Sequence, residues 1–357
     1  MKSKLSRVYE ILSERDIDAI ITSDGYNMRY ISGYAGATGF MYITRGRKVI
    51  ITDSRYTVQA KEEAPDFEVV QISTEKNYKQ ILEEFVKSES INRAGFEDKS
   101  VSYGEYKLLS GLKEDMELVE LGDDLNRLRV IKTSAEIENI AMAEHIGDVA
   151  FKKILDYIKP GMTELQVAAM LEFYMKEEGA EGLSFDTIVA SGINSSKPHA
   201  VPGRKKIEAG DFVTMDFGCI YKGYCSDMTR TIVMGSANAK QKEIYNTVLK
   251  AQLSALDMIK AGVKCADVDK VARSIIGDAG YGDCFGHGLG HSVGLYIHES
   301  PSLSTASKDT LASGMLETVE PGIYVEGFGG VRIEDLVVVT PEGYRNLTES
   351  PKELIEL

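Results

Sequence analysis

The chain has 357 residues, of which 43% are hydrophobic and 27% charged, and its formal net charge at pH 7 is -14. A chain of this length can form two domains with a substantial buried core. The acidic balance argues against nucleic acid or an anionic membrane as the main partner, because both require a basic face, although it equally serves solubility.

Residues 1–8 are charged and amphipathic, which differs from the apolar core of a signal peptide. No apolar run approaches the ~18 residues that a membrane span needs. The four cysteines form no Cys-x-x-Cys pair; they are Cys219, Cys225, Cys265 and Cys284. These features favour a cytoplasmic protein with free thiols.

Short helical and strand patterns alternate along residues 1–125. Helices are predicted over residues 3–15, 56–63 and 78–88, and strands over 19–22, 39–44, 48–52 and 68–72. Alternation of this kind favours an α/β layer domain. This region contains no histidine or cysteine, so we expect no chemistry in it. We place a boundary near residues 128–132, which divides the chain into domains 1–128 and 129–357.

The second domain has a different pattern. Thr133 and Thr163 each begin a capping box, which predicts helices to about residues 158 and 179. A strand over 185–190, a hairpin over 212–231 and helices over 239–261 and 266–277 follow, and the last part is glycine-rich and strand-like. Four main helices with several strands indicate an α+β domain rather than a doubly wound one. The same region contains every histidine of the chain.

The predicted hairpin carries Asp216 and Asp227. If its centre lies between Tyr221 and Lys222, the two aspartates are directly opposite, with Cβ atoms roughly 5 Å apart. Carboxylates this close repel unless they share a proton or coordinate a metal. Because the strands alternate, polar residues line one face and apolar residues the other. A solvated hairpin face is the alternative explanation.

Three further segments stand out. Residues 286–299 contain His287, His291 and His298 among glycines that disfavour a helix, and neutral imidazoles bind metals or hydrogen-bond carbonyls. Glu320 precedes a Pro-Gly turn that holds it in extended backbone. Residues 329–340 are predicted to form one interior strand. The alternative explanation for the histidine cluster in residues 286–299 is that its members have only structural roles.

Arg332 and Glu334 lie on one face of that predicted strand and need partners in an apolar sheet, for which a buried salt bridge is the alternative explanation. The candidate ligands from all segments are four carboxylates and one imidazole: Asp216, Asp227, His291, Glu320 and Glu334. Two divalent cations match four carboxylates in charge, polarise a carbonyl and generate hydroxide from water. Carboxylate-rich ligation with one imidazole suits Mn, Co, Fe or Zn.

Taken in order, these segments resemble the signature of the pita-bread metallopeptidases, which include Xaa-Pro dipeptidase (prolidase), aminopeptidase P, methionine aminopeptidase and creatinase. Residues 27–33 and 52–56 are similar to segments of the creatinase/prolidase N-terminal domain. The resemblance implies an α/β N-terminal domain of that type followed by an α+β pita-bread catalytic domain. It also implies a homodimer that acts on small Xaa-Pro peptides.

The resemblance further assigns roles to the residues. It implies that Asp216 binds one metal, that Asp227 and Glu334 bridge both, and that His291 and Glu320 complete the other site. A metal-bridging hydroxide then attacks the carbonyl before proline. Manganese is the expected metal, with cobalt, zinc or iron as alternatives.

The family also suggests residues that handle the substrate. His199 is expected to line the substrate pocket, and His298 to bind the scissile carbonyl or its tetrahedral adduct. His287 and Arg332 are expected to support the site, while Glu320 shuttles a proton to the leaving proline nitrogen. His298, Glu320 and His199 are therefore the candidate catalytic residues.

One position departs from the family pattern. Prolidase-like members often carry arginine where this chain has Ser302, and that arginine suits the carboxylate of a dipeptide. The sequence therefore leaves Xaa-Pro dipeptidase and aminopeptidase P activity open. An inactive relative that binds peptides or proteins, and an aminopeptidase without proline specificity, are the other hypotheses. The N-terminal domain disfavours methionine aminopeptidase, and the complete ligand set disfavours creatinase.

Overall fold

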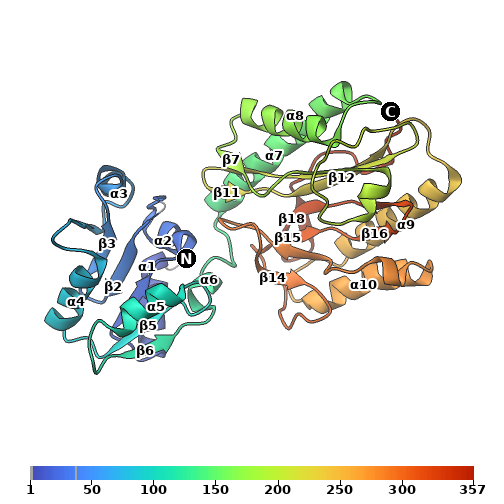
Figure 1. The fold of residues 1–357 in the computed structure, drawn as a ribbon. Coiled ribbons are helices and arrows are strands. Elements are labelled where there is room, and N and C mark those ends of the chain that lie inside the picture. Colours follow the sequence, from blue (N-terminus) through green and yellow to red (C-terminus); the bar gives the residue numbers. More distant parts are fainter. Residues whose placement is uncertain (1–2, 37) are drawn as a thin grey trace. The chain divides into compact units, whose positions relative to one another are not determined.

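The computed structural model describes residues 3–36 and 38–357 and divides into two compact units (Figure 1). The first unit ends at Arg129 and the second begins at Val130. Residues 1, 2 and 37, which the sequence analysis assigns to the first domain, lie outside the described residues. Each unit has its own hydrophobic core.

The first unit is a six-stranded sheet with helices, in the strand order β4-β3-β2-β1-β5-β6. Strand β2 is antiparallel to both of its neighbours, and the remaining pairs are parallel. The strands are β1 (Ala19–Thr22), β2 (Phe40–Thr44), β3 (Lys48–Thr52), β4 (Glu68–Gln71), β5 (Arg93–Phe96) and β6 (Glu117–Glu120). The helices are α1 (Lys4–Glu14), α2 (Gly25–Ser32), α3 (Thr57–Glu63), α4 (Tyr78–Ser88), α5 (Tyr103–Ser110) and α6 (Asp124–Arg127).

The apolar runs of the first unit explain its core. The run Ala-Ile-Ile-Thr has no polar alternation, which is typical of a strand covered on both faces, and all four residues of β1 are buried. Helix α4 adds four buried apolar residues at helical spacing, from Ile81 to Val86. The expected α/β layer domain is confirmed.

The second unit contains two helix pairs and a set of small sheets. Its helices are α7 (Ser134–Tyr157), α8 (Glu164–Glu177), α9 (Ala239–Leu256) and α10 (Cys265–Asp278), with short 3₁₀ helices at Gly192–Ser196 and Gly282–Cys284. Its strands are β7 (Gly182–Leu183), β8 (Ile188–Ser191), β9 (Phe212–Phe217), β10 (Cys219–Tyr221), β11 (Tyr224–Cys225), β12 (Met228–Val233), β13 (Gly290–Ser292), β14 (Glu299–Leu303), β15 (Leu316–Val319), β16 (Gly322–Val325), β17 (Gly329–Arg332), β18 (Asp335–Val339) and β19 (Tyr344–Asn346).

The strands of this unit lie between the helix pairs (Figure 1). Helices α7 and α8 pack on β8, β9 and β12 in one apolar cluster, whereas α9 and α10 pack with residues of β15 to β18 in another. Side-chain capping boxes begin α7 at Thr133 and α8 at Thr163, as predicted. The α+β architecture is therefore confirmed, and it leaves the polar faces of the central strands between the two apolar clusters.

Two predicted element boundaries were wrong. The helix predicted over 239–261 ends at Leu256, because the chain then turns and the Ala261 N–H donates to the carbonyl of Thr340. The strand predicted over 185–190 begins only at Ile188, where pairing with Asp216 of β9 starts.

The predicted hairpin register was also wrong. Tyr221 pairs with Tyr224, so the turn consists of Lys222 and Gly223, which have φ of 48° and 81°. Two residues with positive φ form the tight turn whose twist matches the flanking strands, and glycine adopts that conformation without steric cost. Asp216 consequently faces Thr229. The two aspartates are diagonal neighbours on one face instead of directly opposed residues.

Residues 329–340 form two strands instead of the single strand that was predicted. Strand β17 pairs with β16, whereas β18 pairs with β15 and β19. The break falls at Glu334, whose N–H donates to the carbonyl of Thr229. The chain therefore crosses from one small sheet to the next beside β12, and this crossing places the side chain of Glu334 near the hairpin.

All four cysteines are free thiols, as expected, and three of them are buried. Within residues 3–36 and 38–357, every helix is too short or too polar to span a bilayer.

Candidate metal centre

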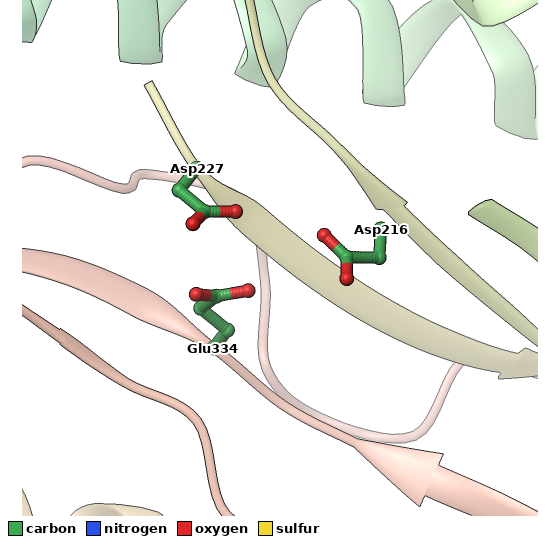
Figure 2. Close-up of side chains that lie close together, drawn as sticks. All are labelled: Asp216, Asp227 and Glu334. Carbon is green, nitrogen blue, oxygen red and sulfur yellow. The ribbon is translucent and has the colours of Figure 1, made fainter. Parts of the chain in front are cut away.

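Three carboxylates from separate segments converge beside β12. Asp216 lies on β9, Asp227 directly precedes β12, and Glu334 lies between β17 and β18. Figure 2 shows their side chains turned toward one another, and each offers an oxygen within 4.8 Å of the others. Asp227 is 5% exposed and Glu334 is 1% exposed. Asp216 is partly buried. Acids this close either share a proton or require a compensating positive charge.

The electrostatics of these acids in the absence of a cation reflect that requirement. Burial, together with the neighbouring carboxylates, raises the pKa of Asp227 and of Glu334 well above the ordinary range. Among the described residues, Asp216 Oδ1 and Glu334 Oε1 are buried and accept no hydrogen bond. Buried oxygens without a donor are rare in proteins, and a divalent cation would both satisfy them and reverse the pKa shifts.

His291 and Glu320 extend the cluster. Nε2 of His291 lies 3.5 Å from Asp227 Oδ2 and 3.6 Å from Glu320 Oε1. Its Nδ1 lies 3.1 Å from the carbonyl oxygen of Ser292, so Nδ1–H donates there and the Nε2 lone pair faces the acids. Burial lowers the pKa of His291 to about 4, which keeps the imidazole neutral at neutral pH.

Strand β15 fixes the relative position of these two groups. The hydroxyl of Thr318 donates to Glu320 Oε1 over 3.1 Å and accepts the backbone N–H of His291 over 3.0 Å. Burial raises the pKa of Glu320 to about 8. The donor set is thus four carboxylates and a neutral imidazole, which fits hard to borderline divalent cations such as Mn²⁺, Co²⁺, Fe²⁺ or Zn²⁺.

A cavity of about 830 Å³ opens onto the cluster. This volume lies within the roughly 300–1,000 Å³ of small-molecule sites. All nine residues that the sequence analysis selected line the cavity: His199, Asp216, Asp227, His287, His291, His298, Glu320, Arg332 and Glu334. The structure therefore brings the whole predicted set together in one place.

The other histidines of the cavity have separate surroundings. The ring centroid of His298 lies 4.6 Å from that of His291, and partial burial lowers the pKa of His298. Nε2 of His287 lies 3.0 Å from the hydroxyl of Tyr324, and burial lowers the pKa of His287 to about 4. His298 is thus a neutral imidazole that is accessible from the cavity, whereas His287 is bound to the wall.

Arg332 is fully engaged by the wall of the cavity. It is 3% exposed, and its guanidinium donates to Asp216 Oδ2 over 2.5 Å, to the Tyr324 hydroxyl over 2.8 Å and to Thr229 Oγ1 over 3.0 Å. The buried salt bridge considered for this residue therefore exists, and its partner is Asp216. This pair fixes the orientation of the Asp216 carboxylate.

Sequence reasoning missed three residues that hold the cluster. Thr229 donates to Glu334 Oε2 over 2.7 Å, and Tyr324 links Arg332 to His287. Glu144 of α7 accepts the backbone N–H of Asp227 over 3.2 Å. Thr229 and Asp227 lie on the same face of one predicted strand, so the sequence could have indicated Thr229 as a site residue. Glu144 is a buried glutamate on an amphipathic helix, and nothing in the sequence indicated its role.

The chain belongs to metallopeptidase family M24. A model of that family matches residues 138–341, and a model of the creatinase/prolidase N-terminal domain matches residues 4–131. The family membership implies divalent metal ions, for which the acidic cluster provides ligands. The protein is therefore a metallopeptidase with a creatinase-type N-terminal domain, which confirms the resemblance seen in the sequence.

Relatives match along nearly the full chain. The uncharacterized peptidase YqhT of Bacillus subtilis (strain 168) is 45% identical over 354 residues, covering 99% of this chain and 100% of that protein. The solved structure of an Xaa-Pro dipeptidase from Bacillus anthracis has a TM-score of 0.96 at 44% identity and covers 99% of both chains. The structure of an X-Pro aminopeptidase from Thermotoga maritima MSB8 has a TM-score of 0.91 at 38% identity, covering 98% of this chain and 100% of that chain.

Proposed function

We propose that this protein hydrolyses the peptide bond that precedes proline, with two divalent cations as cofactors. The observation that carries the proposal is the convergence of Asp216, Asp227 and Glu334 with His291 and Glu320 at one cavity. Similarity to an Xaa-Pro dipeptidase and to an X-Pro aminopeptidase supports the proline specificity.

In the proposed arrangement, Asp216 binds one cation, Asp227 and Glu334 bind both, and His291 and Glu320 complete the second site. The short distances from His291 to Asp227 and Glu320 support this division. Bound cations would polarise the scissile carbonyl and lower the pKa of a water molecule. We propose manganese as the metal, with cobalt, zinc or iron as alternatives of similar ligand preference.

The residues around the cations act on the substrate and its protons. His298, neutral and accessible, donates a hydrogen bond to the carbonyl oxygen as negative charge develops on it. Glu320 takes a proton from the attacking water on a carboxylate oxygen and delivers it to the proline nitrogen. Arg332 holds Asp216 in one orientation throughout, and His199 contributes to the wall of the substrate pocket.

The charged residues that line the cavity affect which lengths of peptide it can accept. Among the described lining residues, Arg332 is the one lysine or arginine, and it is committed to Asp216 and Tyr324. Ser302 lies across from His291 on β14 and offers only a hydroxyl. A free carboxylate directly after proline therefore gains little from the wall, so we propose that peptides continuing beyond proline are accepted at least as well as dipeptides.

Two measurements test the proposal. Removal of metal with EDTA should abolish cleavage of Ala-Pro and Ala-Pro-Ala, and restoring single metals should recover it, with manganese most effective. The ratio of kcat/KM for the two peptides then reports on length preference. A protein that cleaves neither peptide with any metal would instead be the inactive peptide-binding relative.

A further inference from the structure

Lys132 is a buried cation that the chemistry described above does not use. It lies in the segment before α7, and its side chain is 2% exposed. Nζ donates to Ser292 Oγ over 3.0 Å and to Glu299 Oε2 over 3.2 Å, while the backbone N–H donates to the carbonyl of Gly314 over 2.9 Å. A lysine that is fully buried and doubly bonded has a fixed position.

The partner of Lys132 is the centre of a short loop. Glu299, whose side chain is 4% exposed, accepts the backbone N–H of Tyr296 at Oε1 over 3.2 Å. A Cβ at Gly294 would lie 2.4 Å from Glu299 Oε2, so a side chain at this position would displace the carboxylate. Residues 292–299 are therefore wrapped around the ion pair.

Both ends of this loop border on histidines of the metal centre. His291 directly precedes Ser292 and bonds its carbonyl through Nδ1. His298 directly precedes Glu299, and its ring lies against that of His291. Lys132 thus connects the two ends of the loop from behind, through Ser292 at one end and Glu299 at the other.

We propose that Lys132 is a positioning residue that sets the separation of the imidazoles of His291 and His298 through its bonds to Ser292 and Glu299. The inference rests on the function proposed above, which gives these imidazoles their roles. A buried ion pair that loses one partner leaves an uncompensated charge, and the loop must move to hydrate it. A displacement of about 1 Å at a reacting group costs on the order of 10²-fold in rate.

The first test is K132M in the metal-loaded enzyme, with Ala-Pro-Ala as the substrate. We expect kcat to fall about 10- to 100-fold, with KM and bound metal close to those of the parent. A kcat unchanged in the folded variant would overturn the proposal, since a residue needed only for stability lowers the melting temperature and not kcat. K153M is the matched control, because Lys153 forms its two ion pairs, with Glu177 and Glu178, at the surface.

A double variant tests whether Lys132 and Glu299 act together or independently. In K132M/E299Q no buried charge remains unpaired, so we expect its kcat to be no lower than that of K132M. Losses that multiply between K132M and E299Q would show that the two residues do not act as a unit, and would contradict the proposal.

Imidazole NMR signals provide a readout that does not require activity. The chain has five histidines, so the signals can be assigned with single variants. In K132M the signals of His291 and His298 should shift, while that of His145, exposed on α7, should not. Unshifted signals would reject the role of Lys132 even if the parent cleaves Xaa-Pro peptides, and shifted signals would support it even if the parent cleaves none.

Discussion

Glu334 and Asp335 are adjacent in the sequence and both buried, but their carboxylates have opposite surroundings. Both oxygens of Asp335 are bonded, Oδ1 by Arg230 over 2.8 Å and Oδ2 by Lys352 over 2.6 Å. Burial alone would raise the pKa of Asp335, but these cations overcome it and lower the pKa below its ordinary value. Glu334 faces other acids, and its pKa is raised.

The same contrast divides the two faces of β12. Arg230 points away from the cavity and donates to the carbonyls of Thr229, Glu334, Ser350 and Pro351 as well as to Asp335. Asp227, near the start of this strand, faces the cavity with like charges around it. A buried charge whose partners are all in the protein is compensated within the fold, whereas one that lacks such partners indicates a ligand site.

The largest expected effect concerns the cavity face. D227A removes a carboxylate that is proposed to bind both cations. We expect loss of bound metal and a fall in kcat/KM of at least about 10³-fold, since charge stabilisation by the cations disappears. Metal analysis of the purified variant alongside peptide assays measures both quantities. Retained turnover with two bound metals would remove Asp227 from the metal centre.

A smaller effect is expected at His298, which lies beside the cluster without belonging to it. H298A should keep its metal and lose about 10²–10³-fold in kcat, the usual cost of one oxyanion donor. Steady-state kinetics and metal content, each measured on the same preparation, provide the comparison. Loss of metal from H298A would instead make His298 a structural or ligating residue.

Two neutral substitutions compare the adjacent acids directly. In metal-free protein, D335N should lower the free energy of unfolding by about 3–5 kcal/mol, because Arg230 and Lys352 lose a buried partner. E334Q should leave that free energy unchanged or raise it, because it removes repulsion. Urea unfolding of both variants measures the two free energies of unfolding. If E334Q destabilised the protein as much as D335N, the two acids would not differ in the way described.

The last comparison concerns the pH dependence of the metal-free protein. Glu320 has a folded-state pKa of about 8 against an ordinary value of 4.5, so between these values the folded state holds more protons than the unfolded state. Stability from this group is therefore complete below pH 4.5 and lost as the pH rises to 8. Calorimetry should show the melting temperature falling over this window, and metal-loaded protein should lack that fall. A melting temperature that rises with pH in metal-free protein would contradict the raised pKa of Glu320.

Local signals predicted the elements that they directly control. The capping boxes at Thr133 and Thr163 and the apolar run of β1 depend on residues within a few positions of one another, and all three are observed. The hairpin register failed because it depends on Lys222 adopting positive φ, which its residue type does not indicate. The break before β18 failed because a bond to Thr229, 105 residues away in the chain, determines it.

The candidate site shows the same difference between what the sequence indicates directly and what depends on contacts between distant segments. Its members could be selected because their residue types and order match a family pattern, and all of them line one cavity. Their partners could not be selected. That Arg332 pairs with Asp216, and that Glu144 bonds the backbone of Asp227, depends on contacts between segments whose spacing in the sequence carries no such information.

A crystal structure of the protein with manganese, with anomalous scattering recorded at the manganese edge, tests the central claim most directly. Two anomalous peaks are expected among Asp216, Asp227, His291, Glu320 and Glu334, with all five residues bonded as proposed and Arg332 still on Asp216. An absence of peaks at these carboxylates, or a Glu334 side chain turned away from both aspartates, would contradict the account.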